Sequence, residues 1–122
     1  MILLELKNYV NGEFVSAHDG QTLDDINPAN GEVIATIPRS KANDVERAAR
    51  AAEHAQKDWN ATSLEQRIVW LDTIADALEQ KHEAIAQAES LDTGKPISLA
   101  RRVDASRSVE NFRFFAAFGR EQ

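Results

Sequence analysis

The chain has 122 residues, of which 43% are hydrophobic, and this is enough apolar material for one globular domain. Its 20 acidic and 14 basic residues give a net charge of -6, which opposes binding to the phosphate backbone of nucleic acids. It contains no cysteine, so disulfides, thiolate metal ligands and a cysteine nucleophile are excluded within these 122 residues.

We expect neither a signal peptide nor a membrane span at the beginning of the chain. Its apolar run is interrupted at Glu5 and no cleavage-site pattern follows. No later run approaches the roughly 20 apolar residues that cross a bilayer. We therefore expect a cytoplasmic protein with no membrane partner.

Residues 1–38 have the pattern of short strands separated by tight turns. The stretches KNYV, EFVSA, TLDDIN and EVIATIP are the candidate strands. Three Asx-Gly pairs between them suit the positive φ angles of tight turns, namely Asn11-Gly12, Asp19-Gly20 and Asn30-Gly31. We predict an opening β-hairpin, an extended segment leading into Asn27-Pro28, and a last strand that ends at Pro38.

From residue 40 to residue 122 the apolar side chains recur at three- and four-residue spacing, which is typical of helices. The first helix is predicted over about 41–59, with Ser40 or Asn43 accepting hydrogen bonds from its first turn. A second helix follows Ser63, which forms a capping-box pattern with Gln66.

A third helix is predicted to end at Gly94, and Pro96 suits the first turn of a fourth helix that runs on to Gln122. The resulting fold class is α+β, with an N-terminal hairpin and short strands followed by about four helices. In the last helix, Phe114, Phe115 and Phe118 fall on at least two faces. We therefore expect that helix to expose apolar surface.

Most catalytic patterns are absent from the sequence. The five glycines are too far apart to cradle a phosphate, so no cofactor-binding residue is predicted. His18, His54 and His82 have no metal-ligand spacing and are interpreted as surface histidines. Trp59 and Trp70 lie on or beside apolar stripes, which favours packing in the core over a binding platform.

Two arginines of the stretch VDASRSVENFRFFA allow more than one interpretation. Arg107 either forms a surface ion pair with Asp104 or Glu110, or offers its guanidinium fork to a carboxylate. Helical spacing by itself favours the surface pair. Arg113 lies between two phenylalanines and is predicted to pack its stem against them.

Four motifs in register carry a resemblance to a known family. YVNGEFV, INPANGEVIATIP, the alanine-rich helix that ends at Trp59, and LDTGKP together resemble the amino-terminal segment of the NAD(P)-dependent aldehyde dehydrogenase superfamily. The stretch AQAESLDTGKPISLARRVDASRSVENFRFFA is similar to the branch that oxidises 2-aminomuconic and 2-hydroxymuconic semialdehydes. The resemblance covers nearly the whole chain.

The resemblance implies a Rossmann-type α/β parent fold, of which residues 1–122 would be the N-terminal part of the cofactor-binding domain, without the catalytic domain. It also implies NAD or NADP as cofactor, a small aldehyde as substrate and a homo-oligomeric full-length enzyme. In that family a cysteine thiolate attacks the aldehyde, hydride passes to the nicotinamide, and a glutamate activates the hydrolytic water. Since those groups are missing here, we expect a fragment with no catalytic residue and no activity by itself.

Three positions match places with a family role. The resemblance implies that Arg107 holds a substrate carboxylate, although relatives often carry Ile-Pro where this chain has Ala105-Ser106. It further implies that Asp104 and the carbonyl of Ile26 bind a sodium or potassium ion, because such ions prefer oxygen ligands. An alternative is a non-catalytic α+β protein that associates with full-length dehydrogenase subunits. A dehydrogenase of simple aldehydes that carry no acid group is a third possibility.

Overall fold

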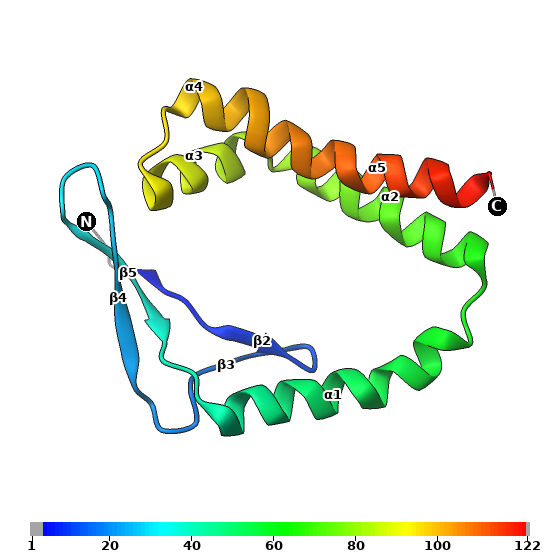
Figure 1. The fold of residues 1–122 in the computed structure, drawn as a ribbon, viewed down its shortest axis with the longest axis horizontal. Helices are drawn as coiled ribbons and strands as arrows, with labels where there is room; N and C mark the ends of the chain where they lie inside the picture. The colour runs from blue at the N-terminus through cyan, green and yellow to red at the C-terminus, as the bar shows by residue number, and fades with distance from the viewer. Residues whose placement is uncertain (1–3, 122) are drawn as a thin grey trace. The chain divides into compact units, whose positions relative to one another are not determined.

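The computed structural model describes residues 4–121 and divides the chain into two compact units, one up to Ala61 and one from Thr62. The first unit contains the strands and one long helix, whereas the second is entirely helical (Figure 1). This α+β content agrees with the fold class predicted from the sequence. No helix within residues 4–121 is both long and apolar enough to cross a membrane.

The first unit is built around a three-stranded sheet. Its central strand β5 (Val33–Pro38) pairs in parallel with β1 (Leu4–Glu5) and antiparallel with β4 (Thr22–Ile26). The β-branched side chains of β5 suit this central position, where Ile34 is buried. As predicted, β5 ends at Pro38, but the two-residue strand β1 was not predicted.

The opening hairpin joins β2 (Asn8–Val10) to β3 (Glu13–Val15) in antiparallel register. Asn11 and Gly12 both have positive φ angles, +53° and +82°, as a two-residue turn of type I′ requires. Tyr9 pairs with Phe14 across the hairpin, with ring centroids 5.0 Å apart. The predicted hairpin is therefore confirmed.

Helix α1 (Ala42–Asn60) is capped by a side chain other than those predicted. The carboxylate of Asp44 accepts hydrogen bonds from the backbone N–H of Lys41 at 2.9 Å and of His18 at 2.7 Å. These bonds, that from Lys41 above all, lower the pKa of Asp44. The prediction of Ser40 or Asn43 as the cap was wrong, because Asp44 reaches back from the first turn and also fixes the preceding loop.

The second unit begins with α2 (Leu64–Gln80) and α3 (His82–Thr93). Ser63 caps α2, since its Oγ accepts from the backbone N–H of Gln66 at 3.2 Å. Gly94 ends α3 with a φ angle of +72°, and its N–H donates to the carbonyl of Ser90. This left-handed cap is what the sequence predicted.

The last helical segment contains an irregularity that the sequence did not predict. It runs through α4 (Ile97–Leu99), the π-helical turn η1 (Ala100–Ala105) and α5 (Ser106–Arg120) without a break. Figure 1 shows α5 lying alongside α2, while η1 packs against α3. The helix ends at Arg120 instead of continuing to Gln122, which lies outside the described residues.

Alanine forms most of the helical core. Five alanines of the second unit are completely buried, namely Ala75, Ala86, Ala100, Ala105 and Ala116. Such small side chains let the helices approach closely, but they leave many large apolar side chains outside.

Trp59 and Trp70 are 46% and 49% exposed, so their predicted place in the core was wrong. The expected apolar surface of the last helix is confirmed, since Phe114, Phe115 and Phe118 are each more than half exposed.

Candidate functional site

Helix α5 has two faces with different roles. Val109 and Ala116 are buried, and a Cβ on Gly119 would lie 3.1 Å from Ile68 of α2, so this face packs against α2. Arg107, Asn111, Phe114 and Phe118 follow one another at intervals of four, three and four residues, which places them together on the opposite face. All four are exposed, so this second face is open to a ligand or a partner.

Arg107 lies at the beginning of this open face. Within residues 4–121, no hydrogen bond or ion pair engages its guanidinium, and neither predicted surface pair forms. Asp104 binds Lys95 instead, at 2.7 Å. A guanidinium without an internal partner retains its fork of donors for a carboxylate from outside.

Four other arginines of the second unit have internal partners, namely Arg67, Arg101, Arg113 and Arg120. Arg113 donates to Glu79 at 2.6 Å and lies 3.0 Å from Asp76, which are ion pairs that the sequence did not predict. The packing of its stem against the phenylalanines stays a prediction. Arg120 pairs with Asp72, also in α2. Arg102 resembles Arg107, because it is exposed and no ion pair holds it within the described residues.

Arg101 forms a bidentate pair with Glu83 of α3. Its Nε and Nη2 donate to the carboxylate at 2.8 Å and 2.6 Å, and Gln87 adds a bond of 2.8 Å. The bonds from Arg101, followed by that from Gln87, lower the pKa of Glu83 to about 2. This pair joins η1 to α3.

This depressed pKa predicts an acid-sensitive helical unit. Because the folded pKa of Glu83 lies below its ordinary value, the pair stabilises the fold fully above about pH 4.5 and loses its effect as the pH falls towards 2. The difference in urea midpoint between the wild type and Glu83→Gln should therefore be largest near neutral pH and shrink below pH 4. Glu110→Gln, at an exposed site with no ion pair in residues 4–121, is the control. A difference that stayed constant from pH 7 to pH 2 would contradict this prediction.

The two predicted cation ligands lie in different units. Ile26 is the last residue of β4, whereas Asp104 lies in η1. The Asp104 carboxylate is partly buried and already accepts from Lys95. Within the described residues, no group of three or more His, Cys, Asp or Glu side chains is arranged to hold a metal ion. The predicted cation site remains a prediction.

Lys95 belongs to the turn that connects α3 with α4. Its ammonium donates to Asp104 and, at 3.1 Å, to Glu89 of α3. Its carbonyl accepts from the hydroxyl of Ser90 at 2.6 Å. From the sequence, LDTGKP was predicted to be a structural turn. That prediction did not include the ion pairs by which Lys95 connects α3 with η1.

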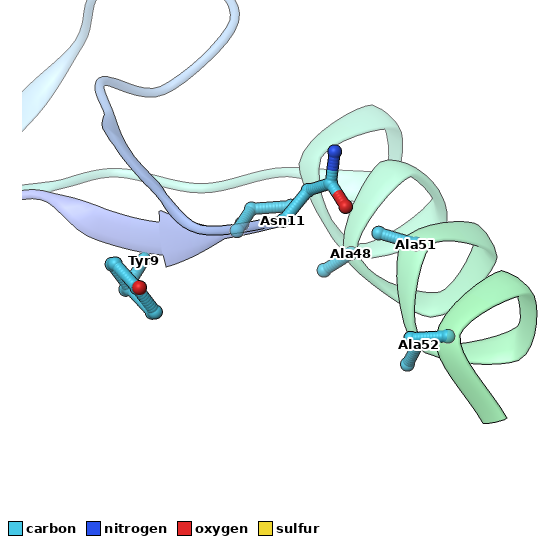
Figure 2. A pocket seen from close by; sticks show the side chains of 7 residues that line it. Tyr9, Asn11, Ala48, Ala51 and Ala52 are labelled. Carbon is cyan, nitrogen blue, oxygen red and sulfur yellow. The ribbon is translucent and has the colours of Figure 1, made fainter. Parts of the chain in front are cut away.

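The first unit has a shallow hollow of about 230 Å³ between the opening hairpin and α1. Figure 2 shows Asn11 and the small side chains of Ala48, Ala51 and Ala52 around it, with Tyr9 on the hairpin. None of the described residues that line it is charged, and Tyr9 alone among them carries a hydroxyl. The hollow therefore has no evident chemistry.

Comparison with known proteins identifies the family of this α+β chain. The model of the aldehyde dehydrogenase family matches residues 14–122, and the chain belongs to that family. It is 43% identical over 115 residues to the 2-aminomuconic semialdehyde dehydrogenase of Homo sapiens, covering 94% of this chain and 23% of that protein. It is 41% identical over 113 residues to the 2-hydroxymuconic semialdehyde dehydrogenase of Pseudomonas sp. (strain CF600), covering 92% and 23%.

The fold agrees with the same family. The NAD+ complex of an aldehyde dehydrogenase from Bacillus cereus superposes with a TM-score of 0.90 at 37% identity, over 93% of this chain and 23% of that one. The chain spans about a quarter of the length of these relatives.

Proposed function

We propose that this chain supplies the N-terminal part of the cofactor-binding domain of an aldehyde dehydrogenase that oxidises a muconic-type semialdehyde to a carboxylic acid. Relatives named for 2-aminomuconic or 2-hydroxymuconic semialdehyde are 41% to 44% identical to it, over at least 92% of the chain. The observation that carries the substrate class is the exposed guanidinium of Arg107, which has no partner within residues 4–121. A muconic-type semialdehyde has a carboxylate for this group to bind.

Under this proposal, this chain contributes to substrate binding, whereas the groups that carry out the oxidation lie outside these 122 residues. Arg107 would hold the carboxylate end of the substrate and so orient the aldehyde at its far end. NAD or NADP would accept the hydride, but the chain has neither a glycine-rich phosphate loop nor a cysteine. We therefore propose that the 122 residues alone have no dehydrogenase activity. From the family resemblance, we also propose that the assembled enzyme is a cytoplasmic homo-oligomer.

A chimera tests this proposal directly. Residues 1–122 would replace the matching segment of the 2-hydroxymuconic semialdehyde dehydrogenase of Pseudomonas sp. (strain CF600). The chimera should oxidise 2-hydroxymuconic semialdehyde with NAD+, followed by NADH absorbance, while the isolated chain should not. Turnover by the isolated chain would refute the division of roles. A folded chimera that bound NAD+ but oxidised only simple aldehydes would refute the proposed substrate class.

A second candidate function is a non-catalytic protein that associates with full-length dehydrogenase subunits. The observation that favours it is the exposure of Phe114, Phe115 and Phe118, which amounts to an unusually apolar helix surface for a free monomer. Light scattering of the chain, alone and mixed with the Pseudomonas enzyme, separates the two functions. Stable co-assembly with intact subunits would favour this candidate, whereas self-association alone would not.

A further inference from the structure

The first two residues of α3 hold the π-helical turn η1 near both of its ends. Glu83 accepts two hydrogen bonds from the guanidinium of Arg101. His82, the first residue of α3, has its Nε2 atom 3.2 Å from the hydroxyl of Ser106, the residue that begins α5. The same hydroxyl lies 3.1 Å from the backbone carbonyl of Arg101. The side chains of α3 and the hydroxyl of Ser106 thus form one connected set of bonds around η1.

The chemistry of these atoms fixes the direction of each bond. A carbonyl oxygen cannot donate, so the single hydrogen of the Ser106 hydroxyl points to the carbonyl of Arg101. Towards His82 the hydroxyl can then only accept, which means that Nε2 of the imidazole carries a hydrogen. His82 therefore donates to Ser106, and Ser106 donates to Arg101. Hydrogen bonds in series polarise one another, so the first bond strengthens the second.

This series of bonds belongs to the irregular part of the helix. The Ser106 hydroxyl binds the carbonyl five residues earlier, which is the spacing of a π-helical turn and not of an α-helical one. The partly buried bond from His82 selects the serine rotamer that makes this contact. Arg107 is the next residue, and no side chain within residues 4–121 holds its guanidinium. The backbone at Ser106 therefore determines where the Arg107 side chain begins.

We propose that His82 and Ser106 are positioning residues for Arg107, and that their hydrogen bonds keep η1 in the π-helical conformation from which Arg107 meets the substrate carboxylate. This inference rests on the proposed function, because it concerns the same arginine. The two residues act through the backbone of Arg107 and not on the substrate. A guanidinium fork binds a carboxylate well only over a narrow range of geometry, so a small shift of the backbone weakens the contact.

Steady-state kinetics of the chimera tests the proposal. His82→Leu removes the donor and should raise KM for 2-hydroxymuconic semialdehyde by about 3- to 10-fold, the size expected for one neutral hydrogen bond, with a smaller change in kcat. Ser106→Ala should have the same effect. His82→Gln brings an amide N–H close to the position of Nε2 and should recover most of the loss. In the Arg107→Gln background, His82→Leu should raise KM no further.

Ser98→Ala and His54→Leu are the matched controls. Both residues are exposed, and no hydrogen bond or ion pair engages their side chains in the part of the chain that the structure describes. Each control should leave KM within about twofold of the unmodified chimera. Helical circular dichroism of every variant verifies that the chimera is folded.

The direction of the first bond is measured separately in the whole 122-residue chain. With the imidazole neutral, Nε2 of His82 should have the 15N chemical shift of a protonated ring nitrogen. An unprotonated Nε2 would overturn the proposal, whatever the kinetics showed.

Two kinetic results would also overturn it. One is an unchanged KM in His82→Leu and Ser106→Ala while Arg107→Gln raises KM, since Arg107 would then bind the carboxylate without their help. The other is a further rise in KM when His82→Leu is added to Arg107→Gln, because the effect of His82 would not pass through Arg107. An unchanged KM in Arg107→Gln itself would refute the proposed carboxylate contact, and this inference with it, so the two failures are distinguishable.

Discussion

Replacing Arg107 by glutamine in the chimera should lower kcat/KM for 2-hydroxymuconic semialdehyde by about 10- to 100-fold, which corresponds to the loss of a charge-assisted hydrogen bond. The effect should appear mainly in KM, because the carboxylate is held equally before and during the reaction. Turnover of a simple aldehyde such as propanal should change little, since it has no carboxylate. Steady-state kinetics with both substrates measures the difference.

Arg102→Gln is the matched control for this experiment. Arg102 is also exposed and without an ion pair in the part of the chain that the structure describes, but it lies in η1 and not on the open face of α5. It should leave both substrates unaffected. If Arg102→Gln and Arg107→Gln reduced the turnover of the semialdehyde equally, a general loss of positive charge would explain both, and Arg107 would have no specific role.

Ala86→Leu should destabilise the helical unit more than any surface change. Ala86 is completely buried together with Ala100 and Ala105, and Ile85 and Ile97 surround the three. Larger side chains forced into a packed core cost typically about 1–3 kcal/mol. In a unit of this size, that cost should lower the thermal midpoint by roughly 5–20 °C. Circular dichroism at 222 nm follows this transition.

Ala88→Leu provides the comparison on the same helix. Ala88 is exposed, so the added leucine atoms meet solvent and the midpoint should move by only about 2 °C or less. Equal shifts for the two variants would mean that α3 does not pack against η1 through its alanines.

Local signals were enough to predict most of the elements of the fold. Asn11-Gly12 predicted the hairpin, Gly94 the end of α3, and Ser63 the start of α2, because each of these residues acts through its own backbone or nearest neighbours. Strand β1 was missed, since a two-residue strand exists only through its pairing with β5. The tryptophans were misplaced because helical periodicity identifies an apolar face but not the element that covers it.

The sequence predicted which residues belong to the candidate site, but it did not predict their contacts. Family motifs drew attention to Arg107 and Asp104, but the choice of ion-pair partners depends on tertiary distances that spacing does not reveal. Lys95 binds Asp104, nine residues away, across the turn between α3 and α4. The adjacent Gly94, which fixes the direction of the chain at this point, was the one available signal.

The π-helical turn η1 absorbs one residue without changing the direction in which the following helix presents its side chains. Such a turn accommodates one more residue than an α-helical turn, and successive α-helical residues point about 100° apart. If residues 100–105 became regular α-helix without losing a residue, Arg107 and the phenylalanines after it would rotate by about that angle. A relative with a one-residue gap at this place and a regular helix would therefore aim the equivalent arginine in the same direction as Arg107.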